Sequence, residues 1–289
     1  MGKYNRTNLK LVQFDINDIK GLIELSASVG WDYDKYEIST VLSTGKIYGH
    51  KNSEGKIVSS AAIIPYDTNL ASIGMVIVNK EYRGLGLGKE ITQKCIDSES
   101  NDISIMLIAT EEGKPLYEKM GFITVDSVHK YICDHYNVKN ILNNWTLCIV
   151  DFTENDLPQI VNIDRAAFGD KRSKFLHNRI IQSEQCLVVK DHKSNIVGYG
   201  LSILGPINLI LGPIVAPDSL TAALILDRLA SRHRGKLRID VPSGNEKFQL
   251  FLEQCGFVKV NQPPIMVTNS VKMPARNKTL FAIAAQIFG

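Results

Sequence analysis

The sequence lacks several features that would assign it to a familiar class of protein. None of its apolar runs approaches the roughly 20 residues of a transmembrane helix, and its first six residues include no apolar segment typical of secretion signals. The formal net charge of +3 is too small to indicate binding to nucleic acid. We therefore expect neither a membrane nor a nucleic acid among the partners of this protein.

Cysteine is scarce as well. The five cysteines are odd in number and lie far apart, which fits neither a disulfide framework nor the spacing of zinc ligands. The six histidines show no His-x-x-x-His pattern, so we expect no metal. The sequence has no Gly-x-Ser-x-Gly segment either, which argues against a serine hydrolase. A reducing cytoplasm is the localisation that this cysteine usage favours.

What the sequence does contain is an internal repeat. Three segments recur in the same order, at offsets of 138, 139 and 135 residues. The first of them reads as a strand, an Asn-Asp helix cap and an amphipathic helix. The matching pairs are 9–19 with 147–157, 56–58 with 195–197, and 120–122 with 255–257. We therefore expect two copies of one α/β fold in the 289 residues.

The first copy contains a glycine-rich turn that suits a pyrophosphate. An apolar strand leads into this turn, and a helix is expected to follow it. Glycine lacks the Cβ atom that would keep a ligand away from the backbone, and free amides at a helix N-terminus attract anions. The glycine spacing meets neither the dinucleotide-binding template nor the Walker template. The candidate cofactor-binding residues are Val76, Ile77, Val78, Arg83, Gly84, Leu85, Gly86, Leu87, Gly88 and Lys89.

A second segment of the first copy places a tyrosine near this turn. The continuous apolar run over residues 105–109 predicts a buried strand. Pro115 and Gly121 suit the start and the end of a short helix after it. That helix presents Tyr117 near the end of the sheet where ligands bind. Tyr117 is therefore either a core residue or a residue of a ligand site.

Both segments resemble the GNAT superfamily of acetyl-CoA-dependent N-acyltransferases. The turn over residues 83–88 matches its Gln/Arg-x-x-Gly-x-Gly/Ala signature, and residues 116–122 resemble the end of its core domain. The resemblance implies an α/β fold, more exactly an α+β domain with a mixed sheet. In this family the sheet splays beside the strand that corresponds to residues 76–78, and the free strand edge there binds the pantetheine arm. The resemblance also implies acetyl-CoA as cosubstrate and Tyr117 as the group that protonates the departing thiolate.

The second copy has lost these features. Residues 211–224, which run parallel to the glycine turn, keep neither its glycine spacing nor its arginine, and Leu252 stands opposite Tyr117. The asymmetry resembles two-domain GNAT proteins in which a degenerate C-terminal domain follows an active one. We expect an acetyl-CoA-binding GNAT domain over 1–135, a linker over 136–145 and a degenerate GNAT-like domain over 146–289.

Two segments are candidates for the acceptor side. A carboxylate acting through water is the usual base in the superfamily, and Glu111, just beyond the strand ending at Ala109, is the candidate base. Trp31, Asp32 and Tyr33 follow the first helix, where GNAT proteins often form the wall of the acceptor site, and Asp32 is a second candidate base. Each of these residues could equally be an ordinary surface or packing residue.

The sequence thus predicts an acetyl-CoA-dependent N-acetyltransferase that transfers an acetyl group directly to a primary amine of a small molecule. The alternative is a non-catalytic sensor or scaffold protein that binds CoA or acyl-CoA, which the absence of an evident base would favour. The second half could form a wall of the acceptor pocket, mediate self-association into a homodimer, or bind a ligand of its own.

Overall fold

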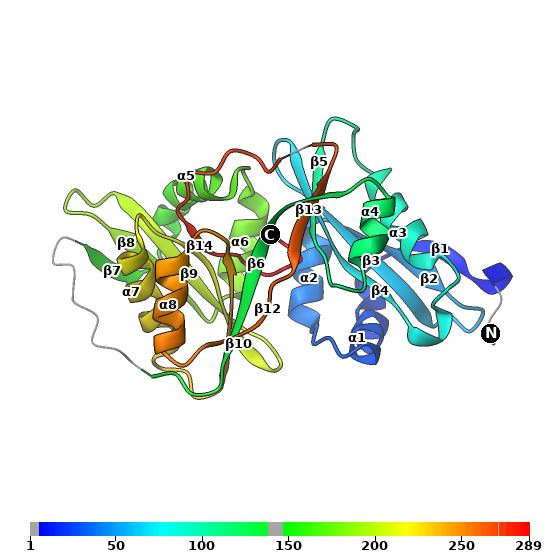
Figure 1. Ribbon diagram of the computed structural model, residues 1–289, viewed down its shortest axis with the longest axis horizontal. Coiled ribbons are helices and arrows are strands. Elements are labelled where there is room, and N and C mark those ends of the chain that lie inside the picture. The colour runs from blue at the N-terminus through cyan, green and yellow to red at the C-terminus, as the bar shows by residue number, and fades with distance from the viewer. Residues whose placement is uncertain (1–5, 138–146, 271) are drawn as a thin grey trace.

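The computed structural model describes residues 6–137, 147–270 and 272–289, and both halves of the chain repeat one order of elements (Figure 1). The first half comprises β1 (Lys10–Phe14), α1 (Ile19–Ser28), α2 (Lys35–Thr44), β2 (Lys46–Lys51), β3 (Ile57–Pro65), β4 (Leu70–Val78), α3 (Leu87–Ile96), β5 (Ser104–Ile108), α4 (Lys114–Lys119) and β6 (Ile123–Cys133). The second half comprises β7 (Cys148–Asp151), α5 (Leu157–Phe168), α6 (Ser173–Gln182), β8 (Gln185–Lys190), β9 (Ile196–Leu204), β10 (Asn208–Val215), α7 (Ser219–Ala230), β11 (Lys236–Pro242), α8 (Glu246–Gln254), β12 (Val258–Asn261), β13 (Pro264–Thr268) and β14 (Leu280–Ala282). The predicted mixed α/β fold and its duplication are confirmed.

The first helix of each half starts in the same way, as the repeated Asn-Asp pattern predicts. A capping box formed by Asp15 and Asp18 precedes α1, and one formed by Thr153 and Asp156 precedes α5. In both, a side-chain oxygen accepts a hydrogen bond from an amide that the helix itself cannot satisfy. Among the described residues, no helix is both long and apolar enough to cross a membrane.

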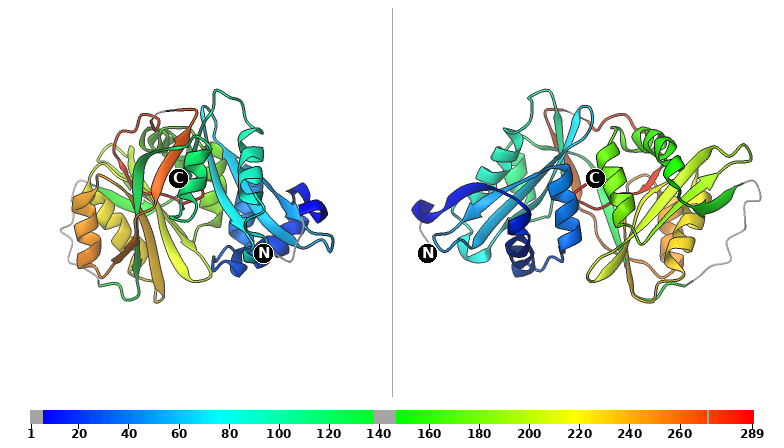
Figure 2. Two further views of the ribbon diagram at one scale, coloured as in Figure 1. Left: turned by 45° about the vertical axis from the view of Figure 1, so that its right-hand side comes forward. Right: turned by 180° about the vertical axis from the view of Figure 1, so that it is seen from behind.

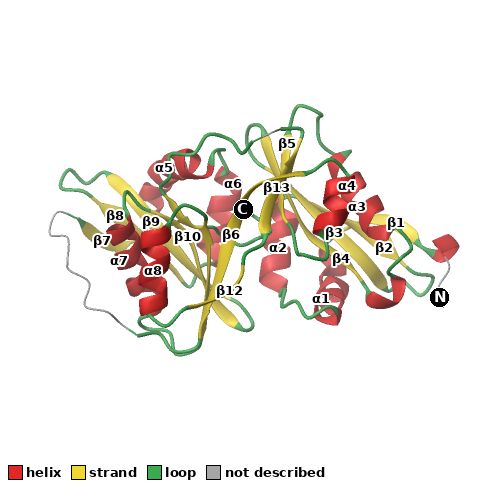
Figure 3. Ribbon diagram, viewed as in Figure 1, coloured by secondary structure: helices red, strands yellow, loops and turns green. Residues whose placement is uncertain are grey.

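Helices cover both faces of the strands in the first half (Figure 3). Successive side chains of a strand point to opposite faces. On β3, Ala62 and Ile64 therefore join the core beneath α1 and α2, whereas Ala61 and Ile63 join a second core beneath α3 and α4. This explains why residues 61–64 of the strand are all apolar rather than alternating between apolar and polar.

The two halves exchange strands where they meet. The strands form one path in the order β1-β2-β3-β4-β5-β13-β6-β11-β10-β9-β8-β7. Strand β13, from the end of the chain, lies between β5 and β6, while the later part of β6 pairs with β11 and β12 of the second half. Figure 2 shows both strands crossing the junction. The division into 1–135 and 146–289 stays a prediction, and most of the expected linker, residues 136–145, lies outside the described residues.

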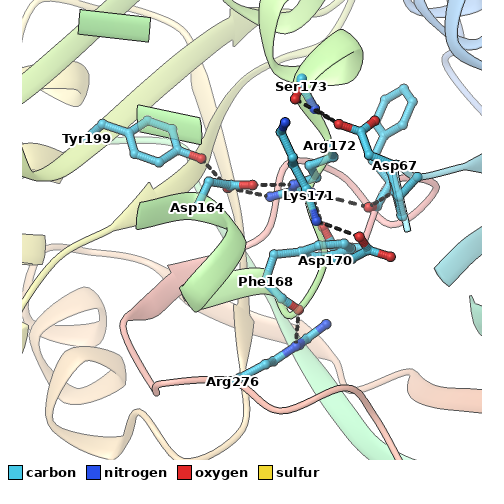
Figure 4. Close-up of polar contacts among 12 residues, drawn as sticks. Asp67, Asp164, Phe168, Asp170, Lys171, Arg172, Ser173, Tyr199 and Arg276 are labelled. Carbon is cyan, nitrogen blue, oxygen red and sulfur yellow. Dashed lines mark hydrogen bonds and ion pairs between the residues drawn. The ribbon is translucent and has the colours of Figure 1, made fainter. Parts of the chain in front are cut away.

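Polar groups in the connection between α5 and α6 also join the halves (Figure 4). The carboxylate of Asp170 accepts hydrogen bonds from the amides of Asn69 and Leu70, at 2.9 and 2.8 Å, in the turn between β3 and β4. Asp67, in the same turn, accepts from the amide and the hydroxyl of Ser173, at 3.1 and 2.7 Å. The second half is thus bonded to the backbone of the first half beside β4.

A buried ion pair lies behind this connection. The guanidinium of Arg172 donates from Nε and Nη2 to the two carboxylate oxygens of Asp164, at 2.8 and 2.9 Å, and neither side chain is exposed. The hydroxyl of Tyr199 donates to the same carboxylate. Nη1 of Arg172 reaches the carbonyl oxygens of Phe288 and Gly289, at 3.4 and 3.3 Å. This bidentate pair therefore links α5, β9 and the final segment of the chain.

We predict that Arg172→Met destabilises the protein by about 3–5 kcal/mol, because it leaves the Asp164 carboxylate buried without its cation. Urea unfolding measures this change. The control is Lys236→Gln, which removes an exposed ion pair with Asp134 (3.2 Å) and should cost less than about 1 kcal/mol. Equal losses in the two variants would contradict the prediction.

Candidate functional site

The site is built where strands β4 and β5 separate. They pair in parallel from Leu70 and Ser104 as far as Ile73 and Leu107, where their ladder ends. Beyond this point β4 carries a bulge at Met75, whose φ is 51°, and then resumes pairing with β3 on its other side. The edge of β4 over Val76–Val78 is therefore not paired with β5. This is the splayed arrangement that the resemblance implied.

The glycine turn follows β4 directly. Asn79 accepts a hydrogen bond from the amide of Glu81 (3.0 Å) and starts a short 3-10 turn. Gly84 and Gly86 have φ values of 83° and 78°, which favour glycine. Helix α3 begins at Leu87 with Gly86 as its N-cap, and no side chain caps its first amides. The turn therefore presents free amides and the positive end of a helix to an anion.

Basic side chains surround this turn, and one of them was not expected from the sequence. Arg83 and Lys89 are exposed, as their predicted contact with a phosphate requires. A guanidinium nitrogen of Arg6 lies 4.0 Å from the position that a Cβ on Gly86 would take. Arg6 forms an ion pair of 2.6 Å with Glu90, on the first turns of α3. About 80 residues of chain separate Arg6 from the turn, so no local pattern could have indicated it.

Tyr117 lies on α4 and is 7% exposed. Its ring packs edge-on against Phe122, with 5.9 Å between centroids, in the core that also contains Cys95. Burial, with a smaller contribution from Cys95, raises the pKa of the Tyr117 phenol, which therefore stays protonated at neutral pH. Glu111 is exposed in the turn before α4. Its catalytic role and that of Tyr117 stay predictions.

A cavity of about 280 Å³ opens between the two halves. Gly74, Met75, Ile108 and Thr110, at the point where β4 and β5 separate, form one side of it. Other lining residues come from the segment between α1 and α2, the β9–β10 hairpin, strands β6 and β11, and the final segment of the chain. The predicted residues Trp31, Asp32 and Tyr33 all line the cavity, whereas Tyr117 and Glu111 are not among its lining residues.

The lining is part aromatic and part charged. The rings of Trp31 and Tyr33 lie 6.1 Å apart, and burial, reinforced by Glu37, raises the pKa of the Tyr33 phenol. Lys130 and Arg238 line the cavity from the strands at the junction. No local pattern in the sequence indicated these two cations. In the part of the chain that the structure describes, no group of three His, Cys, Asp or Glu side chains is arranged to hold a metal ion.

The equivalent groove of the second half is filled by the chain itself. Strands β10 and β11 pair in parallel only from Asn208 to Ile210, and beyond a bulge Ile214 and Val215 take the places that Val76 and Ile77 hold in β4. There β14 pairs with β10. On the β11 side of the groove, the amide of Ile283 donates to the carbonyl of Asp240 (2.9 Å).

The start of helix α7, unlike that of α3, is also occupied by a group of the chain itself. Its N-cap is Asp218, whose side chain accepts a hydrogen bond from the amide of Thr221 at 2.8 Å. A carboxylate thus occupies the place where an anion would bind at α3, and the N-cap of α3 is the side-chain-free Gly86. Leu252, which stands opposite Tyr117, is fully buried in the second core.

We predict that Gly212→Ala displaces β14, because its Cβ would lie 2.2 Å from the carbonyl oxygen of Ile283. The loss of stability should be about 1–3 kcal/mol. Hydrogen exchange should accelerate at the amide of Ala216, which donates to Thr279 (3.0 Å). The control is Gly244→Ala, a glycine with φ of 85° and no atom within 4 Å of its Cβ position. Unchanged exchange at Ala216 in the Gly212 variant would contradict the prediction.

Comparison with known proteins agrees with this architecture. Models of the acetyltransferase (GNAT) domain match residues 40–131 and 160–282, one in each half. The uncharacterized N-acetyltransferase YitH of Bacillus subtilis is 37% identical over 281 residues, which cover 97% of this chain and 98% of that protein.

Solved structures resemble the whole chain. A putative acetyltransferase from Pyrococcus horikoshii superimposes with a TM-score of 0.81 at 20% identity, covering 99% of this chain and 97% of the other. A tandem GNAT protein from the clavulanic acid biosynthesis pathway does so with a TM-score of 0.64 at 12% identity, covering 90% and 98%. With a full-length relative at 37% identity and a GNAT domain in each half, the chain belongs to the GNAT family of N-acetyltransferases as a tandem-domain member.

Proposed function

We propose that the first half binds acetyl-CoA and transfers its acetyl group directly to a primary amine of a small molecule held in the cavity between the halves. One observation carries this proposal. Of two equivalent splayed grooves, the second is filled by β14 and closed by Asp218, whereas the first has a free strand edge and an uncapped glycine turn.

The backbone and the basic side chains of the first groove suit acetyl-CoA. Amides of residues 84–89 would hold the pyrophosphate, and a Cβ on Gly84 or Gly86 would stand in its place. Arg6, Arg83 and Lys89 would add positive charge there. The edge over Val76–Val78 would hydrogen-bond the pantetheine arm as β14 bonds β10 in the second half.

Bound acetyl-CoA would supply the thioester, and residues of this chain would handle the protons. The cavity begins at Met75 and Thr110, so an amine inside it would reach the thioester where β4 and β5 separate. Asp32 lines the cavity, and among the described residues its carboxylate has no ion-pair partner. We therefore favour Asp32 over Glu111 as the group that takes the proton from the ammonium, since Glu111 does not line the cavity. Tyr117 would give its phenolic proton to the departing thiolate.

We expect Gly84→Ala and Gly86→Ala each to weaken CoA binding by about tenfold or more, because the added methyl group occupies the place of the phosphate. Isothermal titration calorimetry measures the dissociation constant and the stoichiometry, which should be one CoA per chain. Gly244→Ala, which imposes a similar positive-φ strain in the second half, should bind CoA as the natural protein does. Two molecules of CoA per chain, or none, would refute the proposed donor site.

The activity itself is tested by the release of free CoA thiol from acetyl-CoA across a panel of amines. We expect turnover with at least one small primary amine. Tyr117→Phe should lower kcat by about 10²–10⁴-fold, because it removes the proton donor while keeping the buried ring. The dissociation constant of the Tyr117→Phe variant for CoA should equal that of the natural protein. Binding of CoA without turnover of any amine would support the sensor or scaffold alternative instead.

A further inference from the structure

The charged groups that line the cavity are mostly neutralised by the protein. Asp34 caps α2 by accepting a hydrogen bond from the amide of Glu37 at 2.8 Å. The carboxylate of Glu37 forms an ion pair with Arg179 and accepts a further hydrogen bond from Gln182 (3.2 Å). These two carboxylates therefore already have partners and are not available to a ligand.

Arg238, which lines the cavity from β11, is only partly engaged. Its Nε donates to Asp240 at 2.8 Å, and Asp240 accepts a second hydrogen bond from Gln286 at 2.9 Å. In the described part of the chain, the two terminal nitrogens of Arg238 donate to no other group. The guanidinium thus keeps donors for a ligand, although its charge is largely balanced.

Among the described residues, this leaves one carboxylate and one ammonium group of the lining without an ion pair or a side-chain hydrogen bond. Neither Asp32 nor Lys130 forms an ion pair or a side-chain hydrogen bond with any other described residue, and both line the cavity. They come from different elements: Asp32 from the segment between α1 and α2, and Lys130 from β6, where it lies across from Asp240 in the register with β11.

Lys130 is also in an environment that favours an added anion. Burial lowers the pKa of its ammonium group, and the positive charge of Arg238 lowers it further, while Asp240 and Asp32 only partly oppose this. A group of opposite charge between Lys130 and Arg238 would compensate the desolvation of both cations. An anionic acid group has this charge, and it can accept hydrogen bonds from both side chains.

We propose that the acceptor is zwitterionic, with an acid group bound by Lys130 and Arg238 and an ammonium group held by Asp32. This inference rests on the proposed function, because it assigns the substrate class of the same cavity. A volume of about 280 Å³ lies near the lower end of the roughly 300–1,000 Å³ typical of small-molecule sites. The acceptor is therefore of the size of an amino acid, or of a small amine that carries a phosphate.

The test compares acceptors that differ only in the acid group. L-Amino acids are paired with their C-terminal amides, and 2-aminoethyl phosphate is paired with ethanolamine, so that the two kinds of acid group are distinguished. For the preferred kind, we expect kcat/KM to be at least about tenfold higher for the acid than for its neutral partner. Lys130→Met should abolish this preference by raising KM for the acid, with little change for the neutral amine.

Further variants separate a binding role from a structural one. Lys130→Arg should retain the preference, and Lys130→Glu should reverse it in favour of the neutral amines. The matched control is Lys193→Met, because Lys193 is exposed in the turn between β8 and β9, away from the cavity. If Lys130→Met does not fold, Lys130→Gln makes the same test.

Two outcomes overturn the inference. One is an equal kcat/KM of the natural protein for the acid and for its neutral partner. The other is that Lys130→Met changes kcat/KM for both acceptors by the same factor. If no amine is turned over, the proposed activity fails, and calorimetric titration of the same pairs into the CoA-loaded protein decides the inference separately. Acid and neutral amine that bind equally, or not at all, would then contradict it.

Discussion

Two parallel strands that diverge leave backbone amides and carbonyls without partners, and this protein contains that situation twice. In the second half, β14 occupies the opening and hydrogen-bonds the freed groups. In the first half the corresponding edge of β4 is not paired with β5. Because unpaired backbone groups favour any extended segment that can satisfy them, the same geometry is a structural joint in one half and a candidate ligand site in the other.

The arrangement of the cavity depends on how firmly the halves are joined. Strands β6 and β13 each pair with strands of the opposite half. The hydrogen bonds of Asp170 to the turn before β4 and the buried pair of Arg172 and Asp164 add directional contacts beside them. The wall that carries Lys130 and Arg238 is therefore held in a defined position relative to Asp32, which a site for a small charged ligand requires.

The sequence predicted the local elements of the first half's candidate site because their signals are local. The glycine turn, the strand before it and the short helix of Tyr117 each lie within a few residues, and backbone preferences and spacing express them directly. The segment 31–33 was also expected at the acceptor side, and all three of its residues line the cavity. Arg6, Lys130 and Arg238 were not found, because each reaches its place through contacts with distant parts of the chain.

Residue types in order along the chain carried the resemblance to the family, the duplication and the loss of the glycine turn from the second copy. Only the tertiary structure decided that β13 and β6 cross between the halves, that β14 fills the second groove, and that Asp32 and Lys130 form no ion pair with another described residue. Strand pairing and charge pairing depend on which segments meet in space. That information lies in the packing of the whole chain rather than in any short stretch of it.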